Sequence, residues 1–175
     1  MTKNYLPISI DISDQKILII GGGQSALKKI RILQRFGANL EVVAENIIEE
    51  ILASGITCFQ KRYERSDLKG YLMLYSCTNN EELDRQIALD GREAGVLVNI
   101  HDKPSLCQFV SPAIYKDGNN SVAVSSNAQD VFESIRLRNL IQEFLEKEKE
   151  KKGTDTGTGK KKDEDEGAAK SFSQA

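Results

Sequence analysis

The fold is decided by one stretch of the chain, Lys16-Ile-Leu-Ile-Ile-Gly-Gly-Gly-Gln-Ser-Ala26. Four apolar residues follow Lys16, as in a short strand that is buried on both faces of a parallel sheet. Beyond the glycines, apolar side chains recur at helical spacing until Gly37, a residue suited to a helix C-terminus. The apolar residues in question are Leu27, Ile30, Leu33 and Phe36. The stretch therefore predicts a strand, a glycine turn and a helix, the first βα unit of a parallel sheet.

The glycine turn has the spacing G-x-G-x-x-A, with Gly21, Gly23 and Ala26 at the marked positions. Gly21 allows a tight turn, Gly23 leaves room for a pyrophosphate beside the backbone, and Ala26 lets the helix pack closely on the strand. The phosphates would then meet free N–H groups at the helix N-terminus. The run Gly21-Gly22-Gly23 thus indicates a dinucleotide site, and a glycine-rich turn without a ligand is the alternative.

The βα alternation continues through the next eighty residues. Further strands are predicted at residues 40–44, 56–60, 71–77 and 96–99. One helix is predicted after Asn46, with Asn46 as its cap, and another after a cap at Asn79. This order is typical of a Rossmann-like α/β fold, a parallel sheet with helices on both faces.

The rest of the chain departs from this alternation. Residues 111–115 and 121–125 flank a turn and predict a β-hairpin, and a last helix carries apolar residues from Val131 to Leu145. From residue 151 onward Phe172 is the one large apolar residue, so this segment cannot offset its ordering entropy. We expect a nucleotide-binding domain at residues 1–112, a hairpin and helix at 113–150, and a disordered, charged tail at 151–175.

Charge and cysteine content exclude several classes of protein. Lys plus Arg number 24 and Asp plus Glu number 26, a net charge of -2 that gives no basic field for nucleic acid. The cysteines number three, without a C-x-x-C pair, which disfavours a disulfide framework and a structural zinc site. No uncharged run approaches the roughly 18 residues that span a bilayer, and the first thirty residues resemble no signal peptide. We expect a cytoplasmic protein without a membrane anchor or a bound metal.

An acid about 20 residues after the glycine turn commonly binds the ribose hydroxyls of NAD. Glu45 fits this place and Glu41 is the second choice, although Glu45 could equally favour the dipole of its own helix. We expect no Arg beside Glu45 to bind a 2′-phosphate. We therefore expect NAD in preference to NADP.

The second group of polar residues follows the fifth predicted strand, in the run Asn99-Ile-His-Asp-Lys-Pro-Ser-Leu-Cys107. It places His101, Asp102 and Lys103 at the carboxyl edge of the sheet, where open α/β folds bind their ligands. A solvated loop before Pro104 is the alternative interpretation.

Taken together, these motifs resemble a known family. Their order matches the precorrin-2 dehydrogenase and sirohydrochlorin ferrochelatase family, the amino-terminal half of siroheme synthase, over about residues 5–145. The matching segments are Tyr5-Leu-Pro-Ile-Ser, Gly21-Gly22-Gly23, Val42-Val43-Ala44, Cys77-Thr78-Asn79, Val98-Asn99-Ile-His-Asp102, Phe109-Val-Ser-Pro-Ala113 and Val122-Ala-Val-Ser-Ser126.

The resemblance implies NAD-dependent oxidation of precorrin-2 to sirohydrochlorin and, in many members, insertion of ferrous iron to give siroheme. It implies that one aspartate, here Asp102, serves both steps as a general base. By the same pattern, the cofactor contacts are Gly21, Gly22, Gly23, Gln24, Ser25, Glu45 and Asn46. Weaker candidates for the tetrapyrrole are Asn99, Lys103 and Ser126, the last of which aligns with a serine that is phosphorylated in some relatives. The hairpin and last helix resemble a dimerisation segment, so a homodimer is expected.

The chain departs from the family in three places. His101 replaces a residue that is commonly aliphatic, so it could share the proton transfer or be a solvated loop residue. The glycine-rich segment after Ser126 reads Asn127-Ala-Gln-Asp130, and the charged tail replaces a further helical segment. The missing segment weakens the ferrochelatase assignment more than the dehydrogenase assignment.

The tetrapyrrole carries many carboxylates, so basic residues are expected along its cleft. The candidates by position are Lys103, Lys116, Arg136 and Arg138, each of which could also be a solvated surface charge. Two other functions stay open: a non-enzymatic module that binds NAD and regulates, and a ferrochelatase that has lost the oxidation.

Overall fold

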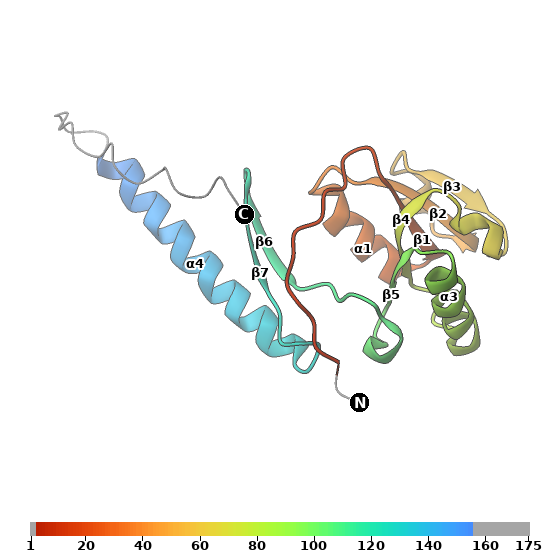
Figure 1. Ribbon diagram of the computed structural model, residues 1–175. Helices are drawn as coiled ribbons and strands as arrows, with labels where there is room; N and C mark the ends of the chain where they lie inside the picture. The colour runs from red at the N-terminus through yellow and green to blue at the C-terminus, as the bar shows by residue number, and fades with distance from the viewer. Residues whose placement is uncertain (1–2, 156–175) are drawn as a thin grey trace, which may run out of the picture. The chain divides into compact units, whose positions relative to one another are not determined.

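A parallel five-stranded sheet dominates the computed structural model, which describes residues 3–155 (Figure 1). The strand order is β3-β2-β1-β4-β5, and every neighbouring pair is parallel. The strands are β1 (Lys16–Gly22), β2 (Asn39–Ile47), β3 (Thr57–Gln60), β4 (Tyr71–Ser76) and β5 (Leu97–Ile100). The predicted Rossmann-like α/β fold is confirmed.

Helices cover both faces of this sheet, because the central strand is apolar on both of its sides. Ile17 and Ile19 of β1 pack in one core with the buried face of α1. Leu18 and Ile20 point to the other face, into a second core with α3. The helices are α1 (Gln24–Gln34), α2 (Glu49–Leu52) and α3 (Glu81–Glu93), with 3-10 helices η1 (Arg65–Leu68) and η2 (Pro104–Leu106).

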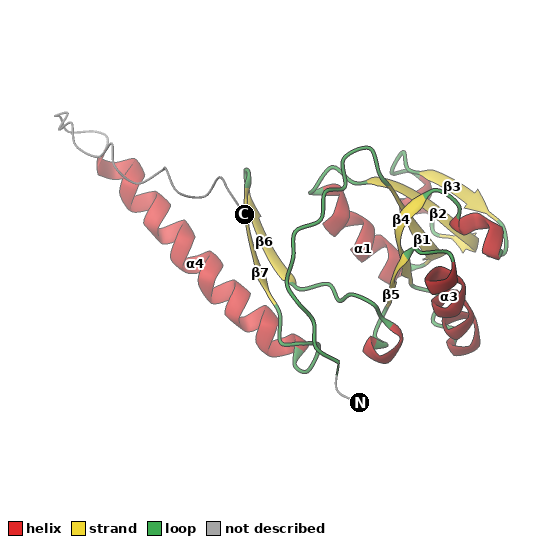
Figure 2. Cartoon of the chain, viewed as in Figure 1, coloured by secondary structure: helices red, strands yellow, loops and turns green. Residues whose placement is uncertain are grey.

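The strands beyond the sheet form the predicted hairpin, and a long helix follows them (Figure 2). Strands β6 (Ala113–Asp117) and β7 (Asn120–Val124) pair in antiparallel fashion. Helix α4 spans Val131–Asp155 and so continues five residues past residue 150, where the last helix was expected to end. The alternating Glu and Lys residues support a helix through pairs such as Lys151–Glu148, 2.7 Å apart. Residues 156–175 of the predicted tail lie outside the described residues.

Two details of the helix starts differ from the prediction. Asn46 does not cap a helix, because β2 continues through Ile47 and Ile48 is the N-cap of α2. The chain is held in the sheet there, since Ile48 N–H donates to the Gly22 carbonyl at 2.9 Å. The cap of α3 is Asn80, whose Oδ1 accepts the Leu83 N–H at 3.1 Å.

The chain divides into two compact units, one through Arg138 and one from Asn139 onward. The first unit contains the sheet, the hairpin and the first turns of α4. The predicted domain boundary between residues 112 and 113 stays a prediction. Within residues 3–155, no helix combines the length and the apolar character needed to cross a membrane.

Candidate functional site

The glycine turn is closed on two sides by backbone. Gly21 has φ +115°, and a Cβ on it would lie 2.5 Å from the carbonyl oxygen of Cys77. A Cβ on Gly22 would collide with the backbone of Asn46 and Ile47. Gly21 and Gly22 are therefore required by the packing of β1 between β2 and β4, whether or not a ligand is present.

Gly23 differs from its two neighbours, because it faces open space. A Cβ on Gly23 would meet nothing within 4 Å, and its φ of -94° suits any residue. Gly23 is the N-cap of α1, and no side chain of the described residues bonds to that helix end. Gln24 and Ser25 begin the helix, whose first turn carries no acid. The uncapped N–H groups and the open approach fit a pyrophosphate.

Glu45 lies near the end of β2 and has a basic partner. Arg62, two residues beyond β3, donates a hydrogen bond from Nε to Glu45 Oε1. The expectation that no Arg stands beside Glu45 is therefore wrong. Pairing of β2 with β3 joins Ala44 to Gln60 and so brings residue 62 to residue 45. The choice between NAD and NADP cannot rest on a missing arginine.

Asn46 and Glu41 are the other candidates on β2. Asn46 is exposed next to Glu45 on the same strand. Glu41 is 9% exposed, and it binds Lys16 Nζ at 2.7 Å and the hydroxyl of Tyr71. Burial raises the pKa of Glu41, but the hydrogen bonds from Lys16 and Tyr71 outweigh it and leave this pKa below its ordinary value. The carboxylate of Glu41 is thus already paired with Lys16 and Tyr71 inside the fold.

Asp102 occupies a tight turn directly after β5. The Lys103 N–H donates to the Ile100 carbonyl at 3.3 Å, and Asp102 has φ +57°. Its side chain is 85% exposed, and His101 Nε2 lies 3.4 Å from its Oδ2. A left-handed backbone is unfavourable for most residues with a Cβ and less so for Asp and Asn, and non-glycine residues held in it tend to occur at functional positions.

The ammonium of Lys103 does not point freely into solvent. Its Nζ lies 2.7 Å from Oδ2 of Asp84, a buried carboxylate on α3. The Asp84 Oδ1 accepts hydrogen bonds from Ser76 Oγ at 2.6 Å and Thr78 Oγ1 at 2.7 Å. Sequence reasoning missed Asp84, because an acid in the first turn of a helix looks like a simple dipole effect.

Asn99 and Ser126, the two other candidates for the substrate, make bonds within the chain. The Asn99 side chain is buried and donates from Nδ2 to the Phe109 carbonyl at 2.9 Å. Ser126 Oγ donates to the Asp130 carbonyl at 2.6 Å and accepts the Asp130 N–H at 3.0 Å. Ser126 therefore fixes the turn that leads into α4.

That turn keeps a left-handed backbone although it lacks the family's glycines. Asn127 has φ +57° and Ala128 has φ +60°. Asn127 Oδ1 accepts the Tyr5 N–H at 2.7 Å, and Nδ2 donates to the Lys3 carbonyl at 2.8 Å. The asparagine thus fastens the N-terminal segment to the turn that leads into α4.

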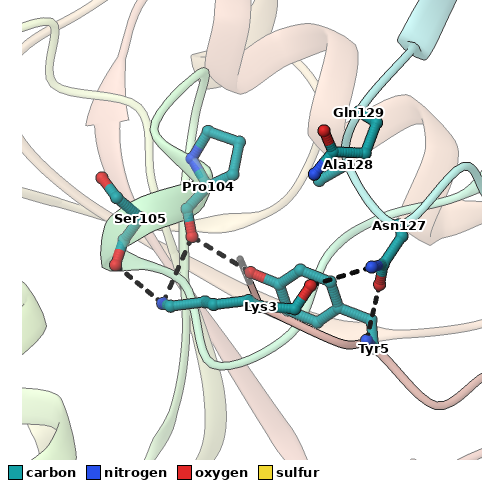
Figure 3. A pocket seen from close by; sticks show the side chains of 7 residues that line it. All are labelled: Lys3, Tyr5, Pro104, Ser105, Asn127, Ala128 and Gln129. Carbon is teal, nitrogen blue, oxygen red and sulfur yellow. Dashed lines mark hydrogen bonds between the residues drawn. The ribbon is translucent and has the colours of Figure 1, made fainter. Parts of the chain in front are cut away.

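A cavity of about 500 Å³ lies between the N-terminal segment, η2 and this turn (Figure 3). Lys3 extends along one side of it and donates from Nζ to the carbonyls of Ser105 and Cys107, each at 2.7 Å. The Tyr5 hydroxyl donates to the Pro104 carbonyl at 3.0 Å. The lining residues are Lys3, Tyr5, Pro104, Ser105, Asn127, Ala128 and Gln129. The cavity therefore borders the segment that follows Asp102.

Lys29 is a further cation that sequence reasoning did not identify. It is half-buried on α1, with Nζ 4.7 Å from the ring centroid of Tyr75 and 2.9 Å from Ser111 Oγ. Burial lowers the pKa of Lys29, and the neighbouring Cys77, Cys107 and Asp102 oppose this shift. Burial also raises the pKa of Cys77 to about 11.

The remaining basic candidates are occupied within the chain. Lys116 lies over the ring of Phe36, 5.5 Å from its centroid. Arg136 makes two bonds of 2.7 Å to Glu133, and Arg138 donates to the Ile114 carbonyl at 3.3 Å. None of the three is placed beside the glycine turn by these contacts.

The candidate site is the carboxyl edge of the sheet. Because all five strands are parallel, the carboxyl ends of β1, β2, β4 and β5 and the residues directly after them lie along this edge. They carry the glycine turn, Glu45, Cys77-Thr78 and Asp102. No group of acids, histidines and cysteines within residues 3–155 has the geometry of a metal site. Fold and turn together define a Rossmann-like dinucleotide-binding domain.

Comparison with known proteins makes this class more specific. Residues 8–113 match the family described as "Putative NAD(P)-binding", and the chain belongs to this NAD(P)-binding family. It is 37% identical over 126 residues to the siroheme synthase of Stutzerimonas stutzeri. The aligned region covers 70% of this chain and 27% of that protein. It is 31% identical over 147 residues to the siroheme synthase of Nitrosomonas europaea, with coverages of 81% and 31%. The resemblance inferred from the sequence motifs is confirmed.

A solved structure shares the fold. The structure of SirC, a precorrin-2 dehydrogenase, has a TM-score of 0.66 to this chain at 22% identity, over 78% of this chain and 68% of SirC. The chain spans about 27% to 31% of the length of the two siroheme synthases.

Proposed function

We propose that this chain binds NAD at the glycine turn and oxidises precorrin-2 to sirohydrochlorin. The observation that carries the proposal is the strained, exposed turn of Asp102 on the same sheet edge as the uncapped N-terminus of α1. The similarity to siroheme synthases and to SirC supports this choice of substrate.

The cofactor would be held by the segments that end β1 and β2. The first N–H groups of α1, at Gln24 and Ser25, would receive the pyrophosphate beside Gly23. Glu45 would accept hydrogen bonds from the ribose hydroxyls, with Asn46 next to it. Bound NAD would supply the hydride acceptor.

Asp102 would act as the general base. Oxidation of precorrin-2 releases a hydride and a proton, and the exposed carboxylate can accept that proton. His101, 3.4 Å from Asp102, would pass the proton on toward solvent or restrain the carboxylate. Asn99 and Ser126 would act in support, because their side chains already hold neighbouring backbone, and Lys103 would do so through its bond to the Asp84 carboxylate.

Insertion of ferrous iron into sirohydrochlorin is the second candidate function. The observation that favours it is the pairing of two proton acceptors, His101 and Asp102, since metal insertion must remove protons from two pyrrole nitrogens. In that reaction ferrous iron is a substrate and not a resident cofactor.

A homodimer through the hairpin and α4 is proposed as well. Apolar side chains on the first turns of α4 are exposed, among them Val131 at 59% and Phe132 at 83%. A second copy of the chain could cover these residues. Light scattering at several concentrations tests this, and a monomer at all of them argues against it.

The decisive assay mixes the protein with precorrin-2 and NAD and records NADH and the sirohydrochlorin spectrum, with and without ferrous iron. The matched variant is Asp102→Asn, because asparagine tolerates the left-handed backbone that alanine would strain. We expect turnover by the wild type and a loss of at least about 100-fold in Asp102→Asn, with NAD affinity unchanged.

Other outcomes select other functions. NAD binding without turnover indicates a regulatory module. Iron insertion without NADH formation indicates a ferrochelatase that has lost the oxidation.

A further inference from the structure

We propose that Asp84 and Lys103 are positioning residues, and that their buried ion pair holds the turn that presents Asp102. The inference rests on the proposed role of Asp102. It assigns a function to a carboxylate on α3 that touches neither the glycine turn nor the exposed side chain of Asp102.

The ion pair is largely buried, and the carboxylate of Asp84 is fully hydrogen-bonded. The side chain of Asp84 is 3% exposed, and that of Lys103 is 30% exposed. Both carboxylate oxygens are used: Oδ2 by Lys103, and Oδ1 by the hydroxyls of Ser76 and Thr78. Three donors and no acceptor surround the carboxylate, which is the arrangement that an ionised acid requires.

The Asp102 turn is fastened on both sides to the carboxyl end of β4. On one side, His101 N–H donates to the Ser76 carbonyl at 2.9 Å. On the other side, the Lys103 ammonium reaches Asp84, which also binds the Ser76 hydroxyl at 2.6 Å. Asp102 itself is almost free of contacts, so its position depends on the two residues that flank it.

The next residue after β4, Cys77, contacts the glycine turn. The Cys77 N–H donates to the Ile20 carbonyl at 2.7 Å, and the Cys77 carbonyl is the group that excludes a side chain at Gly21. Asp84 therefore ties the place where the cofactor would bind to the place where the base stands. A misplacement of about 1 Å between reacting groups can cost about 100-fold in rate.

The test compares two buried acids of one helix. Asp84→Asn and Lys103→Met each remove one partner of the ion pair, whereas Lys103→Arg keeps a cation at position 103. The control is Asp90→Asn, because Asp90 is also buried on α3 but bonds to the Tyr63 hydroxyl at 3.0 Å and to Gln86 Nε2 at 2.8 Å. Either substitution replaces a buried carboxylate whose two oxygens both accept hydrogen bonds, so both variants should lower the melting temperature.

Activity should separate the two acids. We expect kcat to fall at least tenfold in Asp84→Asn and in Lys103→Met while the dissociation constant for NAD changes less than twofold. The double variant should lose no more than either single variant, Lys103→Arg should recover part of the rate, and Asp90→Asn should keep kcat within twofold. Equal losses in Asp84→Asn and Asp90→Asn, or an unchanged kcat in Lys103→Met, would overturn the inference.

A second readout does not depend on turnover. Hydrogen exchange of the His101 and Lys103 amides should accelerate at least tenfold in Asp84→Asn and in Lys103→Met, and not in Asp90→Asn. A wild type without turnover would refute the proposed function. Unchanged exchange in this turn would refute the positioning role whatever the activity.

Discussion

Glu45 at the end of β2 accepts a hydrogen bond from Arg62, which lies just beyond β3. The pair joins, at the place where the adenosine ribose would lie, an acid suited to hydroxyl groups and a cation suited to a phosphate. While Glu45 is present, it holds the guanidinium and would repel a 2′-phosphate. Cofactor choice is therefore expected to depend on which of the two side chains faces the ribose.

The first prediction concerns this choice. Glu45→Gln should weaken NAD binding and strengthen NADP binding, so that the ratio of the two affinities changes by about tenfold or more toward NADP. Calorimetric titration with each cofactor measures it. In the double variant Glu45→Gln, Arg62→Met the increase in NADP affinity should vanish. An increase that persists would show that another cation binds the 2′-phosphate.

The second prediction contrasts two glycines. Gly21→Ala should destabilise the fold by at least about 2 kcal/mol, because its Cβ meets the Cys77 carbonyl and its φ is positive. The free energy of unfolding of Gly23→Ala should lie within about 1 kcal/mol of the wild-type value, but its affinity for NAD should be at least tenfold lower. Urea denaturation and NAD titration check the pair, and full NAD affinity in Gly23→Ala would contradict the assigned site.

The third prediction concerns strain at Asp102. Asp102→Gly should raise the free energy of unfolding by about 0.5–1 kcal/mol, because glycine adopts a φ of +57° without penalty. The same variant should lack the dehydrogenase activity. Urea denaturation measures the first effect, and a loss of stability would show that the carboxylate contributes contacts that outweigh the strain.

The fourth prediction concerns the turn before α4. Ala128→Gly should stabilise the chain by about 1 kcal/mol, since Ala128 has φ +60°. Asn127→Gly keeps the backbone conformation but removes the side-chain hydrogen bonds to Tyr5 and Lys3, so it should release the N-terminal segment. Faster hydrogen exchange at Tyr5 alone would report that release, and unchanged exchange there would show that other contacts suffice.

The fifth prediction is a pH dependence. The pKa of Glu41 is lowered in the folded state by Lys16 and Tyr71, which outweigh the effect of burial. Its contribution to stability is therefore complete above its unfolded pKa and is lost as the pH falls through the lower, folded pKa. Glu41→Gln should lose about 1–3 kcal/mol at pH 7, and the gap to the wild type should narrow below about pH 4. A gap that stays constant down to pH 2 would contradict this.

The sheet could be predicted from the sequence because its strands are short apolar runs. Ile17 to Ile20 are buried on both faces, so the run alone indicates a central parallel strand. The end of β2 could not be predicted in the same way. Asn46 and Glu49 imitate a helix cap, but pairing of Ile47 with Gly22 keeps the chain extended.

The site could be predicted only where one segment supplies it. The glycine turn and the Asp102 turn are each continuous in sequence, and the structure places both at one sheet edge. Arg62 beside Glu45 and Asp84 beside Lys103 depend on strand pairing and on the packing of α3. Such contacts join residues 17 and 19 positions apart, and no local pattern reveals them.

The fastening of the N-terminal segment bears on how the molecule assembles. The bond from Tyr5 to Asn127 joins residues 122 positions apart, and the central sheet lies between them in the chain. Closing so long a loop is entropically unfavourable until that sheet has formed. Tyr5 should therefore dock late in folding, and during synthesis it would lack its partner Asn127 until the turn before α4 has emerged.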